Sequence, residues 1–138
     1  MELFFMKKQA ESWLNAACDD LAVVKEIRNN ANLTNMAAFH CQQTVEKSFK
    51  AVLEEFEGKV PRLHDLITLK EKISGYIDIK VDADIFDQLN ELYIETRYPT
   101  DLGLMPCGKP SPDIAYKFIS LAENIYLEVR EFLSEQGN

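Results

Sequence analysis

The residues best suited to chemistry lie between positions 34 and 57, where polar side chains interrupt a helical apolar pattern. At about 100° per residue, Gln42 falls within the apolar side of that helix and Glu46 falls at its edge. A glutamine in such a place needs hydrogen-bond partners, because a buried and unsatisfied amide costs about 1–3 kcal/mol. A second, polar stripe consists of His40, Gln43, Lys47 and Lys50.

Two interpretations of these polar residues are open. In the first, they form a structural network that ties one helix to its neighbours. In the second, both stripes contribute to a polar pocket that binds a ligand. Lysines on a helix surface are more often solvated than functional, so Lys47 and Lys50 are expected in solvent unless a ligand is present.

A second candidate site lies where the segment 82–97 ends. Arg97 emerges on the same side of this helix as Phe86 and Tyr93. The helix dipole favours a cation at a C-terminus, which explains the charge of Arg97 but not its apolar surroundings. A guanidinium fork also suits a pair of phosphate oxygens. Because Tyr93 and Tyr98 flank the arginine and can stack on a base, the segment favours nucleotide recognition.

Neither a metal centre nor a glycine-rich phosphate-binding loop is expected. His64 and Asp65 could begin a metal phosphohydrolase site, but two histidines in the whole chain are too few for one. The segment 103–109 fits the first seven positions of a phosphate-binding loop. However, Pro110 stands where that loop needs Ser or Thr, and a helix precedes it instead of a strand. The sequence therefore predicts no metal and no cofactor.

The segments that position these residues are predicted to be helices, because apolar residues recur at three- and four-residue steps. The expected helices run from Phe5 to about Arg28, from a cap at Thr34 or Asn35 to about Glu57, from about Leu63 to Ser74, from a cap at Asp82 to about Arg97, and from a cap at Ser111 through Leu133. Residues 98–112 hold four of the five prolines and are expected to form a long loop, which in a compact bundle is more often functional or mobile than idle. The predicted fold is all-α, an up-and-down bundle of four long helices with one additional short helix.

Length and charge narrow the classes of function. A chain of 138 residues supports one domain, spanning 1–138. Its 15 basic and 23 acidic residues give a net charge of −8, which argues against non-specific nucleic-acid binding, so RNA is not an expected ligand. No apolar run approaches the roughly 20 residues of a membrane span, and no secretory signal is evident. Three cysteines without disulfide or metal spacing indicate a cytoplasmic protein.

Several segments together resemble one known family. They are Ala10–Leu21, Ala38–Leu53 with its Phe-His-x-Gln-Gln and Glu-Lys motifs, Leu63–Leu69, and Leu92–Pro99 with its Arg-Tyr-Pro motif. In this order, and over nearly the whole chain, they are similar to a HEPN domain, the helical domain named for higher eukaryotes and prokaryotes nucleotide-binding.

The resemblance implies a helical bundle that is usually homodimeric. It also implies pairing with a minimal nucleotidyltransferase in a module like a toxin–antitoxin pair. Some members are metal-independent ribonucleases with an Arg followed four to six residues later by a His. Here the arginine would be Arg97, and the following positions hold Asp101, Leu102 and Gly103, with no histidine after His64. The missing imidazole argues against ribonuclease activity, and the Arg-Tyr-Pro form resembles the branch for which nucleotide binding was proposed.

The sequence therefore favours a non-catalytic protein that binds a nucleotide, such as ATP or GTP, or a nucleotide-bearing partner. In this hypothesis Arg97 contacts phosphate, helped by Lys47 or Lys50. Tyr93 or Tyr98 stacks on the base, Gln42 and Glu46 hold the geometry, and His40 and Gln43 complete the polar stripe. Two alternatives remain: a pure dimerisation or interaction protein without a small ligand, and a degenerate ribonuclease.

Overall fold

A computed structural model describes residues 6–97 and 109–135; for residues 93–97 it describes the backbone only. Within these ranges the chain is helical and contains no strand, which confirms the predicted all-α class. The elements are α1 (Lys8–Ile27), the 3-10 turn η1 (Ala31–Leu33), α2 (Thr34–Glu57), α3 (Leu66–Ile73), α4 (Ala83–Arg97) and α5 (Pro112–Glu135).

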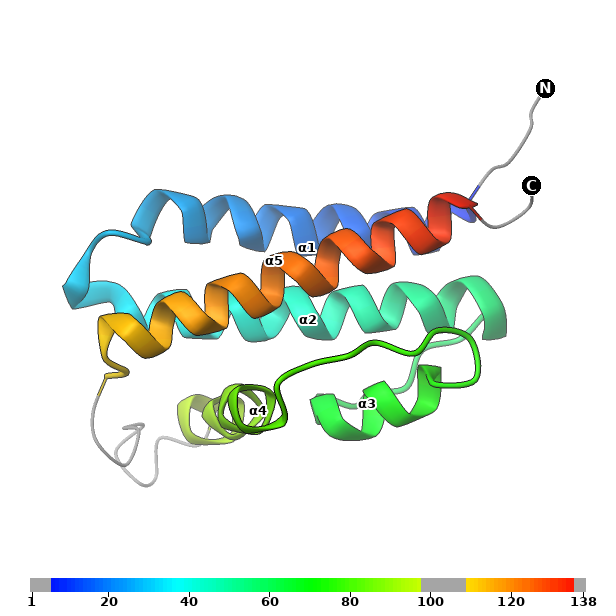
Figure 1. Cartoon of the computed structure of the whole chain (residues 1–138). Coiled ribbons are helices and arrows are strands. Elements are labelled where there is room, and N and C mark those ends of the chain that lie inside the picture. Colours follow the sequence, from blue (N-terminus) through cyan, green and yellow to red (C-terminus); the bar gives the residue numbers. More distant parts are fainter. Residues whose placement is uncertain (1–5, 98–108, 136–138) are drawn as a thin grey trace.

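The helix α2 is the centre of the bundle, because it contacts α1, α3, α4 and α5. Figure 1 shows α1, α2 and α5 running lengthwise beside one another, with α4 seen end-on below them. The short helix α3 lies next to α4 on the same side of α2. None of the described helices is both long enough and apolar enough to cross a membrane.

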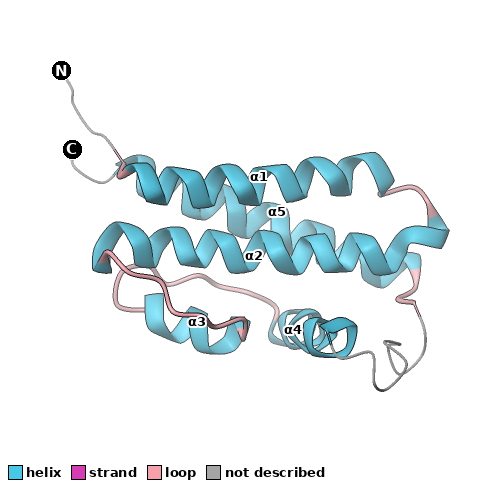
Figure 2. Cartoon of the chain, turned by 180° about the vertical axis from the view of Figure 1, so that it is seen from behind, coloured by secondary structure: helices cyan, strands magenta, loops and turns pink. Residues whose placement is uncertain are grey.

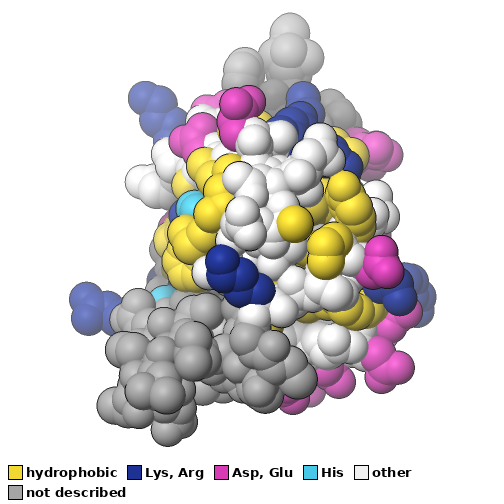
Figure 3. Space-filling view, turned by 90° about the vertical axis from the view of Figure 1, so that its left-hand side faces the viewer, with side chains coloured by type: hydrophobic (Ala, Val, Ile, Leu, Met, Phe, Trp, Pro, Cys, Tyr) yellow, Lys and Arg dark blue, Asp and Glu magenta, His cyan; other side chains and the backbone are white. Residues whose placement is uncertain are grey.

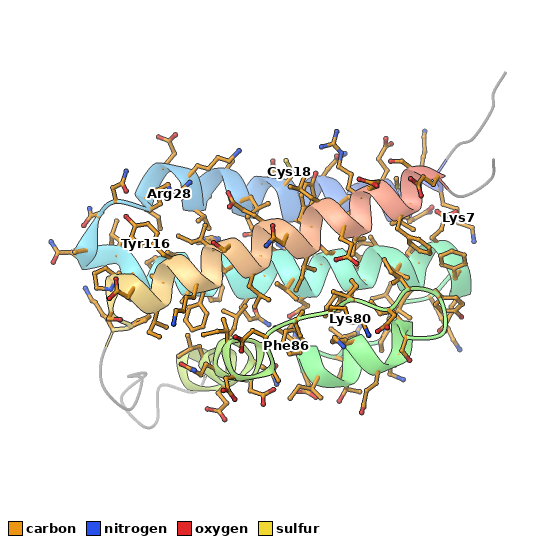
Figure 4. All side chains as sticks on the ribbon, viewed as in Figure 1. Lys7, Cys18, Arg28, Lys80, Phe86 and Tyr116 are labelled. Atoms are coloured by element: carbon orange, nitrogen blue, oxygen red, sulfur yellow. The ribbon has the colours of Figure 1, made fainter. Side chains whose placement is uncertain are left out.

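The core forms where the apolar stripes of these helices meet. Phe49 of α2 and Phe86 of α4 lie with ring centroids 6.2 Å apart, and both side chains are buried. Phe86 points from α4 toward the rest of the bundle (Figure 4). Phe118 of α5 is buried in the same cluster. Because full burial of such a side chain contributes about 1.5–3 kcal/mol, these rings hold α4 and α5 against α2.

The helix α2 begins at Thr34, next to the predicted start, but its predicted cap is wrong. We expected Thr34 or Asn35 to cap the helix, but the residue before it is Leu33, which makes no side-chain capping bond. Instead the 3-10 turn leads directly into α2, and the side chain of Asn30 caps that turn by accepting from the backbone N–H of Asn32 at 2.9 Å. The sequence reading missed this because it assumed a single break between α1 and α2.

Two predicted caps are confirmed and two helix starts are corrected. Asp82 accepts from the backbone N–H of Ile85, and Ser111 accepts from that of Ile114, each at 3.2 Å. The helix α3 begins at Leu66 instead of about Leu63, because the Asp65 side chain caps it. The first helix likewise begins at Lys8, whereas Phe5 lies outside the described residues.

The end of α2 depends on a glycine. Gly58 has a φ of +73°, and its N–H donates to the Glu54 carbonyl at 3.1 Å. A side chain strongly disfavours this left-handed conformation, whereas glycine adopts it freely. Gly75, which ends the α3 region, has no positive φ, and a Cβ there would meet no atom within 4 Å.

We therefore expect Gly58→Ala to lower the free energy of unfolding by about 1–2 kcal/mol, since alanine must adopt the left-handed region. Urea denaturation followed by circular dichroism measures this loss. Gly75→Ala is the matched control and should cost nothing measurable. Equal losses for both variants would contradict the role given to the Gly58 backbone.

Candidate functional site

The polar side chains of α2 are organised by two buried carboxylates. Seen from behind, α2 lies in front of α5, with α1 above it and α3 and α4 below (Figure 2). One carboxylate, Asp20, comes from α1, and the other, Glu46, belongs to α2 itself. Both are less than 10% exposed. A buried charge needs partners to replace lost hydration, so each carboxylate gathers polar groups around it.

The first group, which we call the Asp20 cluster, joins α1 to α2. The Asp20 Oδ1 atom lies 2.8 Å from Nδ1 of His40, and its Oδ2 accepts from the Lys47 ammonium at 2.8 Å. The side chains of His40 and Lys47 are 21% and 26% exposed, so both also reach solvent. Histidine side chains are visible along one edge of the molecular surface in Figure 3.

The second group, the Glu46 cluster, joins α2 to the segment before α3. Glu46 accepts from Lys50 at 2.8 Å and from the Gln42 amide at 3.2 Å, and Nδ1 of His64 lies 3.0 Å from Oε2. The Gln42 amide is also 3.4 Å from the His64 carbonyl oxygen. Gln43 donates to the Gln42 side-chain oxygen at 2.7 Å. The Gln42 amide therefore has the hydrogen-bond partners that its buried position requires, as the first interpretation, a structural network, predicts.

The predicted environment of Lys50 is wrong. The sequence placed this lysine on the polar stripe in solvent, but only 4% of it is exposed. It lies one turn beyond Glu46, and the ion pair draws its ammonium inward. Its Nζ also lies 5.6 Å from the centroid of the Trp13 ring in α1. Lys50 belongs to the Glu46 cluster, whereas His40, Gln43 and Lys47 form the partly exposed polar face of α2.

Sequence reasoning missed two polar residues that matter here. Asp20 is three residues after Ala17 and four before Val24, both buried, and this spacing could have revealed it. Asn90 in α4 is buried beside Leu89 and accepts from the backbone N–H of Leu66 at 2.8 Å. Both lie inside apolar stripes, which is the same signal that singled out Gln42.

Asn90 also fixes the start of α3 through Asp65. The Asn90 amide donates to Asp65 Oδ1 at 2.6 Å, while the backbone N–H and hydroxyl of Thr68 donate to Oδ2. Burial acts to raise the pKa of the Asp65 carboxyl, but the hydrogen bonds from Thr68 and Asn90 outweigh it and lower that pKa. Asp65 is therefore held as an anion that caps α3.

The predicted residues at the end of α4 are only partly described. Arg97 is the last residue of α4, two turns beyond Asn90, so its backbone lies about 10 Å along the helix from the Asp65 contact. The side chains of Arg97 and Tyr93 lie outside the described part, as do Tyr98 and the segment 98–108 with its glycine-rich pattern. For this reason the expected convergence of Arg97 with α2 stays a prediction.

The interactions that the described site offers a ligand are hydrogen bonds and charge. Among residues 6–97 and 109–135, no group of three or more His, Cys, Asp or Glu side chains could hold a metal ion. Cys41, next to His40, is buried, and burial followed by Glu123 and Asp20 raises its pKa to about 12, so its thiol is not a nucleophile.

The cavities on the flanks of α5 do not include this site. One of about 370 Å³ lies between α5 and the segment around Lys80 and Ile85, and one of about 410 Å³ lies between α5 and α1 around Cys18 and Arg130. No member of the Asp20 or Glu46 cluster lines either of them.

Comparison with known proteins supports the family resemblance. The family model for the HEPN domain matches residues 10–132. The crystal structure of TT1696 from Thermus thermophilus is similar, with a TM-score of 0.68 and 24% sequence identity over 91% of this chain and 99% of that chain. At this identity the likeness concerns the fold alone. The search of curated proteins returns no match.

The two lysines should differ sharply in their effect on stability. Lys50→Met removes the ammonium partner of the buried Glu46 carboxylate and is expected to lower the free energy of unfolding by about 3–5 kcal/mol. Lys47→Met should cost less than about 1 kcal/mol, because that pair is partly exposed. Urea denaturation of both variants measures the difference. Similar losses would show that Glu46 does not depend on Lys50.

The lowered pKa of Asp65 has a defined consequence in acid. A carboxyl whose pKa is lower in the folded state stabilises the protein above its unfolded value of 3.8, and this stabilisation is lost as the pH falls below it. In a carboxyl NMR titration we expect Asp65 to titrate below 3.8, and Thr68→Val to raise that midpoint. An unchanged midpoint in the variant would refute the role of the Thr68 hydroxyl.

Proposed function

The chain belongs to the HEPN domain family, and on that premise we propose that it binds a nucleotide, or a partner that carries one, through the polar face of α2. One observation carries this proposal. His40 and Lys47 are held by a single buried carboxylate, Asp20, at 2.8 Å each, yet both reach solvent. Side chains fixed in this way are preorganised for a ligand, because binding restricts them little further.

Arg97 is proposed to complete the site by contacting phosphate. Asn90 ties α4 to the start of α3, beside His64 of the Glu46 cluster, because it accepts from the Leu66 N–H and donates to Asp65. The last two turns of α4 then carry the backbone on to Arg97. The helix dipole favours a cation at this C-terminus, and the guanidinium fork suits a pair of phosphate oxygens. Tyr93 or Tyr98 would stack on the base.

A second candidate function rests on the ion pairs themselves. Lys47 and Lys50 are each engaged with a carboxylate at 2.8 Å, so neither is an unpaired cation awaiting a phosphate. This observation favours a pure interaction protein, in which the polar face docks a second copy or another protein. By family resemblance, that other protein would be a minimal nucleotidyltransferase encoded beside it, in a module like a toxin–antitoxin pair.

Calorimetric titration with ATP and GTP separates these functions. We expect saturable binding of at least one nucleotide, and we expect Arg97→Ala to weaken it by about 1.5–3 kcal/mol through loss of a charged hydrogen bond. Arg28→Ala, an exposed arginine at the end of α1, is the matched control and should leave binding unchanged.

Two results would contradict nucleotide binding at Arg97. The absence of heat with either nucleotide would favour the interaction protein. Light scattering would then be expected to show a change of assembly mass in Arg97→Ala. Equal affinity of the wild type and Arg97→Ala would remove the arginine from the site even if a nucleotide binds.

A further inference from the structure

The two buried carboxylates determine which groups on the polar face accept hydrogen bonds and which donate them. An ionised carboxylate can only accept. Any neutral side chain that bonds to it must therefore turn a donor inward, and the remaining polar atom of that side chain faces the other way. Asp20 and Glu46 thus impose an orientation on the groups around them, and that orientation can be followed outward to the surface.

The first path runs from Glu46 through Gln42 to Gln43. Nitrogen Nε2 of Gln42 faces Glu46 Oε1 at 3.2 Å and the His64 carbonyl oxygen at 3.4 Å, which are both acceptors. The Gln42 oxygen must therefore point away, where it accepts from Nε2 of Gln43 at 2.7 Å. The remaining atom, Oε1 of Gln43, is left as an acceptor on a side chain that is partly exposed.

The second path is shorter and ends at His40. A neutral imidazole has one N–H and one lone pair. In the neutral form of His40, Nδ1 lies 2.8 Å from the Asp20 carboxylate and carries the N–H, so the lone pair is at Nε2. Among the residues that the structure describes, no donor is bonded to Nε2 of His40 or to Oε1 of Gln43.

Helix geometry brings these two acceptors together with a cation. His40, Gln43 and Lys47 are spaced i, i+3 and i+7, so they lie on one side of α2 over about 10 Å. The Lys47 ammonium has three N–H groups and uses one on Asp20. Along α2 the polar face therefore presents an acceptor, a second acceptor, and then a positively charged donor.

From this order we infer that His40 and Gln43 bind hydrogen-bond donors of the nucleoside part of the ligand, and that its phosphate does not bind to these two side chains. This inference rests on the proposed function and specifies how the ligand is oriented. Phosphate oxygens carry lone pairs and would be repelled by those of His40 and Gln43. Ribose hydroxyls and the exocyclic amino group of a base are the donors that a ribonucleotide offers.

The test compares ligands that differ in their hydrogen-bond donors. Wild-type protein is titrated calorimetrically with ATP and GTP, with their 2′,3′-dideoxy analogues, and with purine riboside triphosphate and ITP, which lack the amino group of ATP and of GTP respectively. We expect that removal of either the ribose hydroxyls or the amino group weakens binding about tenfold. This factor is equivalent to one hydrogen bond of about 1.4 kcal/mol. Which analogue binds weakly identifies the donor.

A variant then assigns the donor to the polar face. Gln43→Met removes the acceptor and keeps nearly the same side-chain size. We expect this variant to bind the parent nucleotide and the analogue that the wild type binds weakly with equal affinity. Gln9→Met, an exposed glutamine in α1, is the control and should keep the tenfold difference. Circular dichroism checks that both variants are folded. The comparison of ligands on the wild-type protein does not depend on the folding of any variant.

The possible failures are distinguishable. If the wild type binds every analogue as tightly as ATP or GTP, nucleotide binding stands but the donor inference is wrong. If the tenfold difference persists in Gln43→Met and in His40→Phe, the donor is recognised elsewhere and the inference is again wrong. If no nucleotide binds at all, the proposed function fails and the inference fails with it.

Discussion

A carboxylate buried away from water stays charged only when protein groups replace its hydration. This constraint organises the Asp20 and Glu46 clusters around α2. Glu46 satisfies it with three different partners, which come from α2 and from the segment that leads into α3. Asp20 satisfies it with two side chains of α2 and so links the first two helices. Through these bonds α2 holds its neighbours by charge on one side and by apolar packing on the other.

Much of the fold could be predicted from periodicity, because burial of apolar stripes is what places the helices. The stripe containing Phe49 and the cap at Asp82 are direct examples, and both are confirmed. Helix starts were harder, since the 3-10 turn before Thr34 is stabilised by a side chain outside the helix. Lys50 shows the limit most clearly, because its burial depends on Glu46 and on the Trp13 ring, and neither contact follows from a single helical wheel.

For the candidate site, the sequence could indicate which polar residues are buried but not which partners they bind. Gln42 was found because a polar residue on an apolar side requires partners, and Asp20 and Asn90 carry the same signal but were passed over. What sequence reasoning could not give is which partner each group takes. That assignment depends on the approach of α1 and α3 to α2, as when Asn90 meets Asp65 across 25 residues of chain.

The tethering of His40 and Lys47 by one carboxylate also has an entropic consequence. A free lysine on a helix samples many rotamers, and a ligand that fixes it loses about 0.5–1.5 kcal/mol of affinity for each such side chain. In this bundle the folding reaction has already restricted both side chains, because Asp20 holds them whether or not anything is bound. The polar side chains on this surface of α2 are therefore ordered before any ligand binds. Recognition there would depend on shape and hydrogen-bond direction more than on the density of charge.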